Sequence, residues 1–115
     1  MAKNVAEQLV DTLEKAGVKR IYAVTGDSLN EVNEAVRKSG KIKWIHVRHE
    51  ETGAFAAAAE AQLNGELACC AGSSGPGHVH LINGLYDAQR SGAPVLAIAS
   101  TLPTHEFGTE YFQET

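Results

Sequence analysis

Hydrophobic and polar positions switch between two spacings along this chain, and the switches predict helices separated by short strands. Near the start, Val5 and Leu9 begin an apolar series at helical spacing. Asn4 and Glu7 flank its first turn as a capping-box pair, in which each side chain bonds the backbone N–H of the other residue. We therefore expect the chain to open with an amphipathic helix that ends at Gly17.

Predicted helices and strands continue to alternate as far as residue 100. Ser28 and Glu31 repeat the capping pair and predict a second helix that Gly40 ends. The further predicted helices cover residues 52–63, which are rich in alanine, and 78–90. The predicted strands cover residues 19–25, 42–47, 66–72 and 95–100. Strands that alternate with helices predict an α/β fold, with a parallel sheet and helices on both faces.

The segment 101–115 reads as a loop, and no closing helix and strand follow it. A chain of 115 residues is long enough for one domain with a hydrophobic core and too short for two. We therefore expect residues 1–115 to be one domain that is truncated before its last elements, as part of a longer protein.

Composition and charge argue against several classes of protein. The net charge is −4 and no Lys/Arg cluster extends along a face, which argues against a nucleic-acid-binding surface. No segment is apolar enough to span a membrane, and the N-terminus lacks the apolar core of a signal peptide. We expect a cytoplasmic protein.

The two cysteines, Cys69 and Cys70, are neighbours in the apolar run LACCAG. On a strand their side chains point to opposite faces, which disfavours a disulfide between them. We expect two buried free thiols in a reducing compartment.

The predicted loops that follow the strands indicate where chemistry would take place. Ligands of parallel α/β sheets bind outside the carboxyl ends of the strands. The Gly-rich loop GSSGPG lies at one such end, and it lacks the Lys-Ser/Thr of a phosphate-binding P-loop. A dinucleotide-binding fingerprint is also disfavoured, because His80 stands where its third glycine would be and Pro76 lacks a backbone N–H donor. The loop is therefore either a plain turn into a helix or a close backbone approach to a flat ring or a second chain.

Metal-ligating patterns are weak. His78 and His80 are two residues apart at a predicted helix start, a spacing at which side chains diverge. Asp27, Asn30 and Asn33 could offer oxygen ligands, but the same residue types make an ordinary turn and helix cap. We expect no metal ligands in this chain.

Glu50 has two interpretations. Glu50 and Glu51 precede the alanine-rich helix, where first-turn acids are favoured by the helix dipole. Alternatively, Glu50 stands at the end of the second strand and faces a wall of alanine, where burial would favour the protonated carboxyl and suit a proton donor. The spacing alone leaves both interpretations open.

Several stretches together resemble a known family. They are RHEE followed by AFAAAAEAQL, GSSGPG followed by HLINGLYDA, VTGDSLN, PVLAIAS and FQET. This combination, spread from about residue 5 to 115, resembles the N-terminal pyrimidine-binding domain of thiamine-diphosphate enzymes. The likeness is greatest to pyruvate oxidase and pyruvate dehydrogenase (quinone), with acetolactate synthase next.

The resemblance assigns a role to Glu50, because the essential glutamate of the family directly follows the His of RHE. Its carboxyl is expected to bond N1′ of the cofactor aminopyrimidine and so promote deprotonation of the thiazolium C2. The resemblance also implies further site residues. Those near the cofactor are Thr25, Gly26, Asp27, Ser74, Gly75, Pro76 and Gly77. Those on the substrate side are His80, Phe112 and Gln113.

The resemblance further implies what lies outside this chain. The family holds diphosphate and Mg²⁺ with a GDG…NN motif in a C-terminal domain, and its oxidases bind FAD in a middle domain; neither domain is present here. The implied parent is a homodimer or homotetramer that oxidatively decarboxylates pyruvate or another 2-oxo acid, and any membrane contact would use parts outside this chain. This piece alone is expected to be inactive. The alternatives are an acetolactate synthase-like carboligase and a non-catalytic dimerising module.

Overall fold

The computed structural model describes residues 2–115, and the strands within this range form one parallel sheet. The strands are β1 (Arg20–Ala23), β2 (Lys43–His46), β3 (Ala68–Gly72) and β4 (Val95–Ala99), in the order β2-β1-β3-β4. The α-helices are α1 (Val5–Lys15), α2 (Asn30–Ser39), α3 (Glu50–Asn64), α4 (Pro76–Val79) and α5 (Ile82–Ser91). Two 3₁₀ turns, η1 (Asp27–Leu29) and η2 (Thr104–Glu106), complete the described elements. The predicted parallel α/β fold is confirmed.

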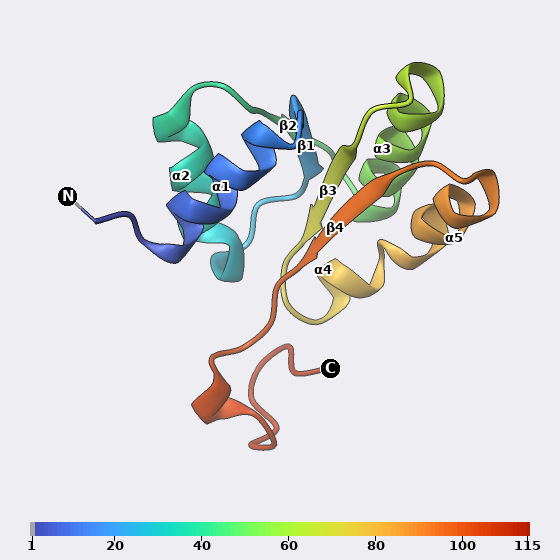
Figure 1. Cartoon of the computed structure of the whole chain (residues 1–115). Coiled ribbons are helices and arrows are strands. Elements are labelled where there is room, and N and C mark those ends of the chain that lie inside the picture. Colours follow the sequence, from blue (N-terminus) through green and yellow to red (C-terminus); the bar gives the residue numbers. More distant parts are fainter. Residues whose placement is uncertain (1) are drawn as a thin grey trace.

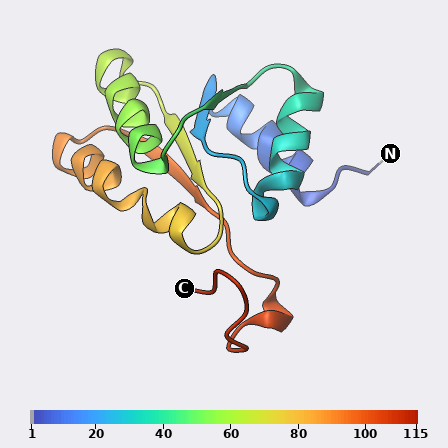
Figure 2. The same ribbon diagram turned by 180° about the vertical axis from the view of Figure 1, so that it is seen from behind.

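Helices cover both faces of the sheet, as the sequence predicts. α1 and α2 lie on one face, and α3 and α5 lie on the other (Figure 1, and from behind in Figure 2). The strands divide their side chains between the two layers, because successive residues of a strand point to opposite faces. Ile21 and Ala23 of β1 pack in the core under α1 and α2, whereas Tyr22 packs in the core under α3 and α5.

The central strand β3 is buried along its whole length. Cys69 belongs to one core and Cys70 to the other, so the neighbouring thiols lie on opposite sides of the sheet and are both free. Burial raises the pKa of each thiol to about 12, with a smaller contribution to Cys69 from its neighbour. The predicted pair of buried, unlinked cysteines is confirmed.

Local signals at helix ends are mostly realised. Asn4 Oδ1 accepts from the Glu7 backbone N–H at 2.8 Å, and the Asn4 N–H donates to the Glu7 carboxylate at 3.1 Å, which completes the predicted capping box. Gly40 and Gly65 end their helices in the left-handed conformation that glycine adopts without a Cβ penalty. Within residues 2–115, each helix is too short or too polar to cross a membrane.

The predicted cap at Ser28 is wrong. The chain first makes the turn η1, and α2 begins only at Asn30 without a side-chain cap. Ser28 lies inside the turn, and its hydroxyl bonds instead to the loops that follow β3 and β4. The Ser28 hydroxyl therefore bonds to residues that are distant in sequence and does not cap the N–H groups of α2.

Two predicted helix boundaries are also wrong. The alanine-rich helix begins at Glu50 rather than residue 52, so Glu50 is the first residue of α3 and does not lie on a strand. The predicted helix 78–90 is split into α4 and α5. Pro76 starts α4 early because its fixed φ suits the first turn, and the Leu81 N–H bonds the His78 carbonyl in a tighter 3₁₀ pattern that separates the two helices.

The strand order creates a switch point between β1 and β3. From β1 the chain moves outward to β2, and from β3 it moves in the opposite direction to β4. Ligands of open α/β sheets bind where the connections diverge in this way, outside the carboxyl ends of the strands. The loops 24–29 and 73–77 leave the sheet side by side at this point (Figure 1).

Candidate functional site

A pocket of about 310 Å³ opens at this switch point. Its lining comes from the segments after β1, β2 and β3, together with the C-terminal segment. The lining residues are Thr25, Gly26, Asp27, Glu50, Ser73, Ser74, Pro76, Gly77, His80, Phe112 and Gln113. Its volume lies at the low end of the range for ligand pockets, as suits a site that receives one part of a larger molecule.

Glu50 supplies the carboxyl group of this pocket. It is the first residue of α3, and the side chain of His49 caps the helix by accepting from the Glu51 N–H at 3.3 Å. The Glu50 side chain is only 12% exposed. Its Oε2 lies 3.0 Å from Nδ1 of His80, one of the two residues that join α4 to α5. The carboxyl is thus held between the start of one helix and the junction of two others.

The rings of His49 and His80 stack, with centroids 4.4 Å apart and planes inclined by 24°. One ligand atom from each of His49, Glu50 and His80 lies within 4.8 Å of the others. The lone pairs of stacked rings run side by side rather than toward one point, and Nδ1 of each ring already has a hydrogen-bond partner. We therefore describe the three residues as a cluster in which His80 bonds the Glu50 carboxyl and His49 supports the His80 ring by stacking.

The predicted wall of alanine does not face Glu50. Ala54, Ala57 and Ala61 are buried between α3, α5 and the sheet, and the pocket lining contains none of the alanines. Their small size instead lets α5 approach closely: a Cβ on Gly84 would lie 2.4 Å from the Ala54 Cβ. The alanine-rich run therefore packs helices, and the loops after β1 and β3 surround the carboxyl.

Close backbone approaches shape the Gly-rich loop after β3. A Cβ on Gly72 would lie 2.4 Å from the Gly77 carbonyl oxygen, so only glycine permits this tight return of the chain. A Cβ on Gly77 would lie 3.5 Å from Glu50 Oε1, and it would narrow the pocket beside the carboxyl. These approaches lie within the chain itself and make the loop a tight turn into α4. The other sequence-based interpretation, a close backbone approach to a flat ring or a second chain, stays a prediction.

The C-terminal segment folds back onto this loop. Gly75 has φ +66°, and a Cβ there would lie 2.7 Å from the Gln113 carbonyl oxygen. Ser74, which is only 6% exposed, donates its hydroxyl to Gln113 Oε1 at 3.4 Å. Phe112 is 75% exposed at the mouth of the pocket. Residues about 60 positions from Glu50 in sequence are thereby brought to the same cavity.

The sequence-based site residues are largely brought together. All line the pocket except Gly75, which packs behind the loop against Gln113. Sequence reasoning missed Ser73, which lines the pocket, and His49, which caps α3 and stacks on His80. The signal for His49 was its place directly before Glu50, whereas nothing local distinguished Ser73 from other loop serines.

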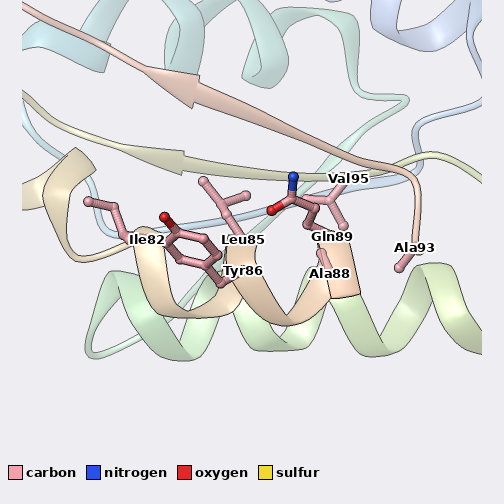
Figure 3. Close-up of a pocket in the computed structure, with 7 residues that line it drawn as sticks. All are labelled: Ile82, Leu85, Tyr86, Ala88, Gln89, Ala93 and Val95. Atoms are coloured by element: carbon pink, nitrogen blue, oxygen red, sulfur yellow. The ribbon is translucent and has the colours of Figure 1, made fainter. Parts of the chain in front are cut away.

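A second, roomier pocket of about 570 Å³ lies between α5 and β4 (Figure 3). Its lining is mostly apolar, and Tyr86 is its only residue with a titratable side chain. It contains no carboxyl, imidazole or thiol group. We therefore place the candidate chemistry at the smaller pocket around Glu50.

The chemical capacity of the smaller pocket follows from its parts. A mostly buried carboxyl can hold and pass a proton, and His80 fixes one of its oxygens while Oε1 lies toward Gly77. The lack of a side chain at Gly77 leaves room beside Oε1 for a flat group to lie against the backbone. The arrangement suits a bound heteroaromatic ring whose nitrogen shares a proton with Glu50.

Comparison with known proteins shows similarity to proteins that use thiamine pyrophosphate. Residues 3–115 match the family model described as thiamine pyrophosphate enzyme, N-terminal TPP binding domain. The chain is 49% identical over 113 residues to a putative thiamine pyrophosphate-containing protein, YdaP, of Bacillus subtilis, covering 97% of this chain and 20% of the relative. It is 44% identical over 107 residues to pyruvate oxidase of Lactiplantibacillus plantarum, covering 92% and 18%.

A third relative is an enzyme with a different name and activity. Over 110 residues the chain is 38% identical to acetolactate synthase 3, chloroplastic, of Brassica napus, covering 96% of this chain and 17% of the relative. The chain thus spans about a fifth of the length of these three relatives.

Proposed function

The chain belongs to the thiamine pyrophosphate enzymes, as a match to their N-terminal TPP binding domain, and from this premise we propose that its pocket receives the aminopyrimidine end of thiamine diphosphate. The observation that carries the proposal is the Glu50 carboxyl, mostly buried at the switch point of the sheet and bonded to His80. Glu50 is the residue that would share a proton with the ring.

The residues present fit such a group. Gly77 leaves space beside the carboxyl, since a Cβ there would lie 3.5 Å from Glu50 Oε1. Gly26 lets the loop after β1 approach the loop after β3, since a Cβ there would lie 2.3 Å from Ser73 Oγ. Thr25, Gly26 and Asp27 would border the ring from the β1 side, and the loop 74–77 would border it from the β3 side. His80, Phe112 and Gln113 would face the substrate.

Glu50 would do the chemical work of this half-site. Its carboxyl would exchange a proton with the ring nitrogen, while the contact with His80 keeps Oε2 from rotating. Partial burial limits access of water to that proton. When bound, thiamine diphosphate supplies the electron sink for cleaving the bond between the carboxylate and keto carbons of a 2-oxo acid.

We assign the chain to a longer protein, called here the parent protein, in which other domains complete the site. Those domains would hold the diphosphate with Mg²⁺, and FAD as the electron acceptor. The parent protein would oxidatively decarboxylate pyruvate as a homodimer or homotetramer in the cytoplasm, and this chain alone would be inactive. Similarity to pyruvate oxidase supports this reaction.

Product analysis tests the reaction. Purified parent protein is supplied with pyruvate, inorganic phosphate, thiamine diphosphate, Mg²⁺ and FAD. Acetate or acetyl phosphate, with bleaching of the flavin absorbance in the absence of oxygen, is the expected outcome. Acetolactate as the main product would instead support a carboligase, the alternative that similarity to acetolactate synthase favours.

A non-catalytic dimerising module is the alternative of a different class. Exposed apolar side chains on α3 and α5 favour it: Leu63 is 89% exposed, Tyr86 63% and Ile82 46%. Sedimentation of the 115-residue chain tests it. If the 115-residue chain stays monomeric at high concentration, this alternative is contradicted. If the chain dimerises and the parent protein binds no thiamine diphosphate, the dimerising module is favoured over the enzyme.

A further inference from the structure

The hydroxyl of Ser28 is the centre of a network that joins three loops at the carboxyl edge of the sheet. Ser28 Oγ lies 2.9 Å from Ser73 Oγ and 2.7 Å from Ser100 Oγ, and it accepts from the Ser74 N–H at 3.0 Å. The partners lie 45, 46 and 72 residues away from Ser28 in sequence. One side chain in η1 therefore touches the loop after β3 and the residue after β4.

The direction of each hydrogen bond follows from the donors available. Ser100 donates its hydroxyl to the Gly72 carbonyl at 3.0 Å, so its oxygen accepts from Ser28. Ser28 has then used its only proton, and Ser73 must donate to it. With the Ser74 N–H as its second donor, Ser28 Oγ makes all three bonds that a hydroxyl can make.

This network acts on the loop that borders the candidate site. Ser74 is only 6% exposed, so its N–H would have little access to water if Ser28 lost its oxygen. Gly26 and Ser73 are already in close approach, since a Cβ on Gly26 would lie 2.3 Å from Ser73 Oγ. Loops 24–29 and 73–77, on the two sides of the pocket, are thus in close contact and are joined by the hydrogen bonds of the Ser28 hydroxyl.

We propose that Ser28 is a positioning residue: its hydroxyl fixes the backbone of loop 73–77 against loop 24–29 and so sets the affinity of the pocket for the aminopyrimidine group. The identity of the ligand rests on the proposed function, whereas the fastening of the loop does not. Ser28 itself does not line the pocket around Glu50, so it acts through Ser73 and Ser74.

The test measures the loop and the ligand separately in the parent protein. Ser28→Ala is expected to speed hydrogen–deuterium exchange in peptides that contain Ser74 by about tenfold, because one buried N–H loses its acceptor. The same variant is expected to raise the Kd for thiamine diphosphate by about tenfold, measured by calorimetry. Ser28→Thr keeps the hydroxyl at an exposed position and should restore both values.

Two further variants keep the test decisive. Thr12→Ala removes a hydroxyl that donates to the Gln8 carbonyl at 2.8 Å on α1, and it should change neither readout. Ser28→Cys, with a weaker acceptor of similar size, serves as the loss variant if Ser28→Ala folds poorly. Unchanged exchange at Ser74 in the loss variants would overturn the inference. Faster exchange in a protein whose wild type binds no thiamine diphosphate would support the fastening role of Ser28 and refute the proposed function.

Discussion

His80 Nδ1 lies 3.0 Å from Glu50 Oε2, and this contact joins the first residue of α3 to the junction of α4 and α5. The His80 ring is itself supported by the stacked ring of His49, which caps the helix that Glu50 begins. The carboxyl is therefore oriented by two elements that meet only in the folded chain. Orientation of this kind keeps a proton-sharing group in the position that its reaction needs.

Removing the His80 side chain should therefore impair Glu50 without unfolding the domain. His80→Ala in the parent protein is expected to slow exchange of the C2 proton of bound thiamine diphosphate by about tenfold, the effect of losing one hydrogen bond to a charged or polarised group. His80→Gln, which retains a side-chain donor, should recover part of the rate. His46→Ala, at an exposed histidine at the end of β2, is the control. A wild-type exchange rate in His80→Ala would show that the contact does not orient the carboxyl.

Gly84 should respond to substitution in the direction opposite to an ordinary helix glycine. Gly→Ala in a helix usually stabilises by up to about 1 kcal/mol. At Gly84 the new Cβ would lie 2.4 Å from the Ala54 Cβ and 2.7 Å from its carbonyl carbon, so α3 and α5 would have to separate. We expect Gly84→Ala to lower the free energy of unfolding by about 1–3 kcal/mol. Urea denaturation measures it, with Asn83→Ala on the exposed side of α5 as the control; a more stable Gly84→Ala variant would contradict the close packing of the helices.

The buried thiols predict a loss of stability at alkaline pH. The pKa of both Cys69 and Cys70 is raised from 9.0 to about 12, mainly by burial. Between these values the folded chain retains thiol protons that the unfolded chain has lost. The contribution of the thiols to the free energy of unfolding is therefore fully present below about pH 9, and it is lost as the pH rises toward 12. The slope is at most about 1.4 kcal/mol per pH unit for each thiol.

Urea denaturation between pH 8 and about 10.5 measures this slope. The double variant Cys69→Ala, Cys70→Ala has lower stability because of the volume it loses, but its stability should depend less on pH in this range. Equal slopes in the two proteins would show that the thiols titrate as freely in the folded chain as in the unfolded one.

The sequence was sufficient for the architecture because its signals are local. Periodicity and capping residues such as Asn4 and Glu7 are read within one or two turns, and the alternation of strands and helices then restricts the topology. The edge that carries the loops follows from the parallel arrangement. The sequence therefore predicts Glu50 and the Gly-rich loop as neighbours.

What the sequence could not supply are contacts whose partners are far apart along the chain. Ser28 satisfies the pattern of a helix cap, but its hydroxyl bonds to residues 45 or more positions away. The alanines after Glu50 fit the wall of a site as well as a close helix contact, because a one-dimensional pattern does not say which neighbour they face. They face Gly84 and the sheet, and the site around Glu50 is built from loops.

Exchange of the C2 proton of bound thiamine diphosphate, followed by NMR in the parent protein, tests the central claim about Glu50 most directly. Glu50→Gln keeps the size of the side chain but removes the carboxyl proton, and the rate is expected to fall by about 10²–10⁴-fold. The Kd for the cofactor should rise much less, because we assign the diphosphate and Mg²⁺ contacts to another domain. Glu51→Gln, which alters only a first-turn acid, should cost a few tenths of a kcal/mol of stability and leave the rate nearly unchanged. Near-normal exchange in Glu50→Gln, or a larger loss in Glu51→Gln, would contradict the assignment of the chemistry to Glu50.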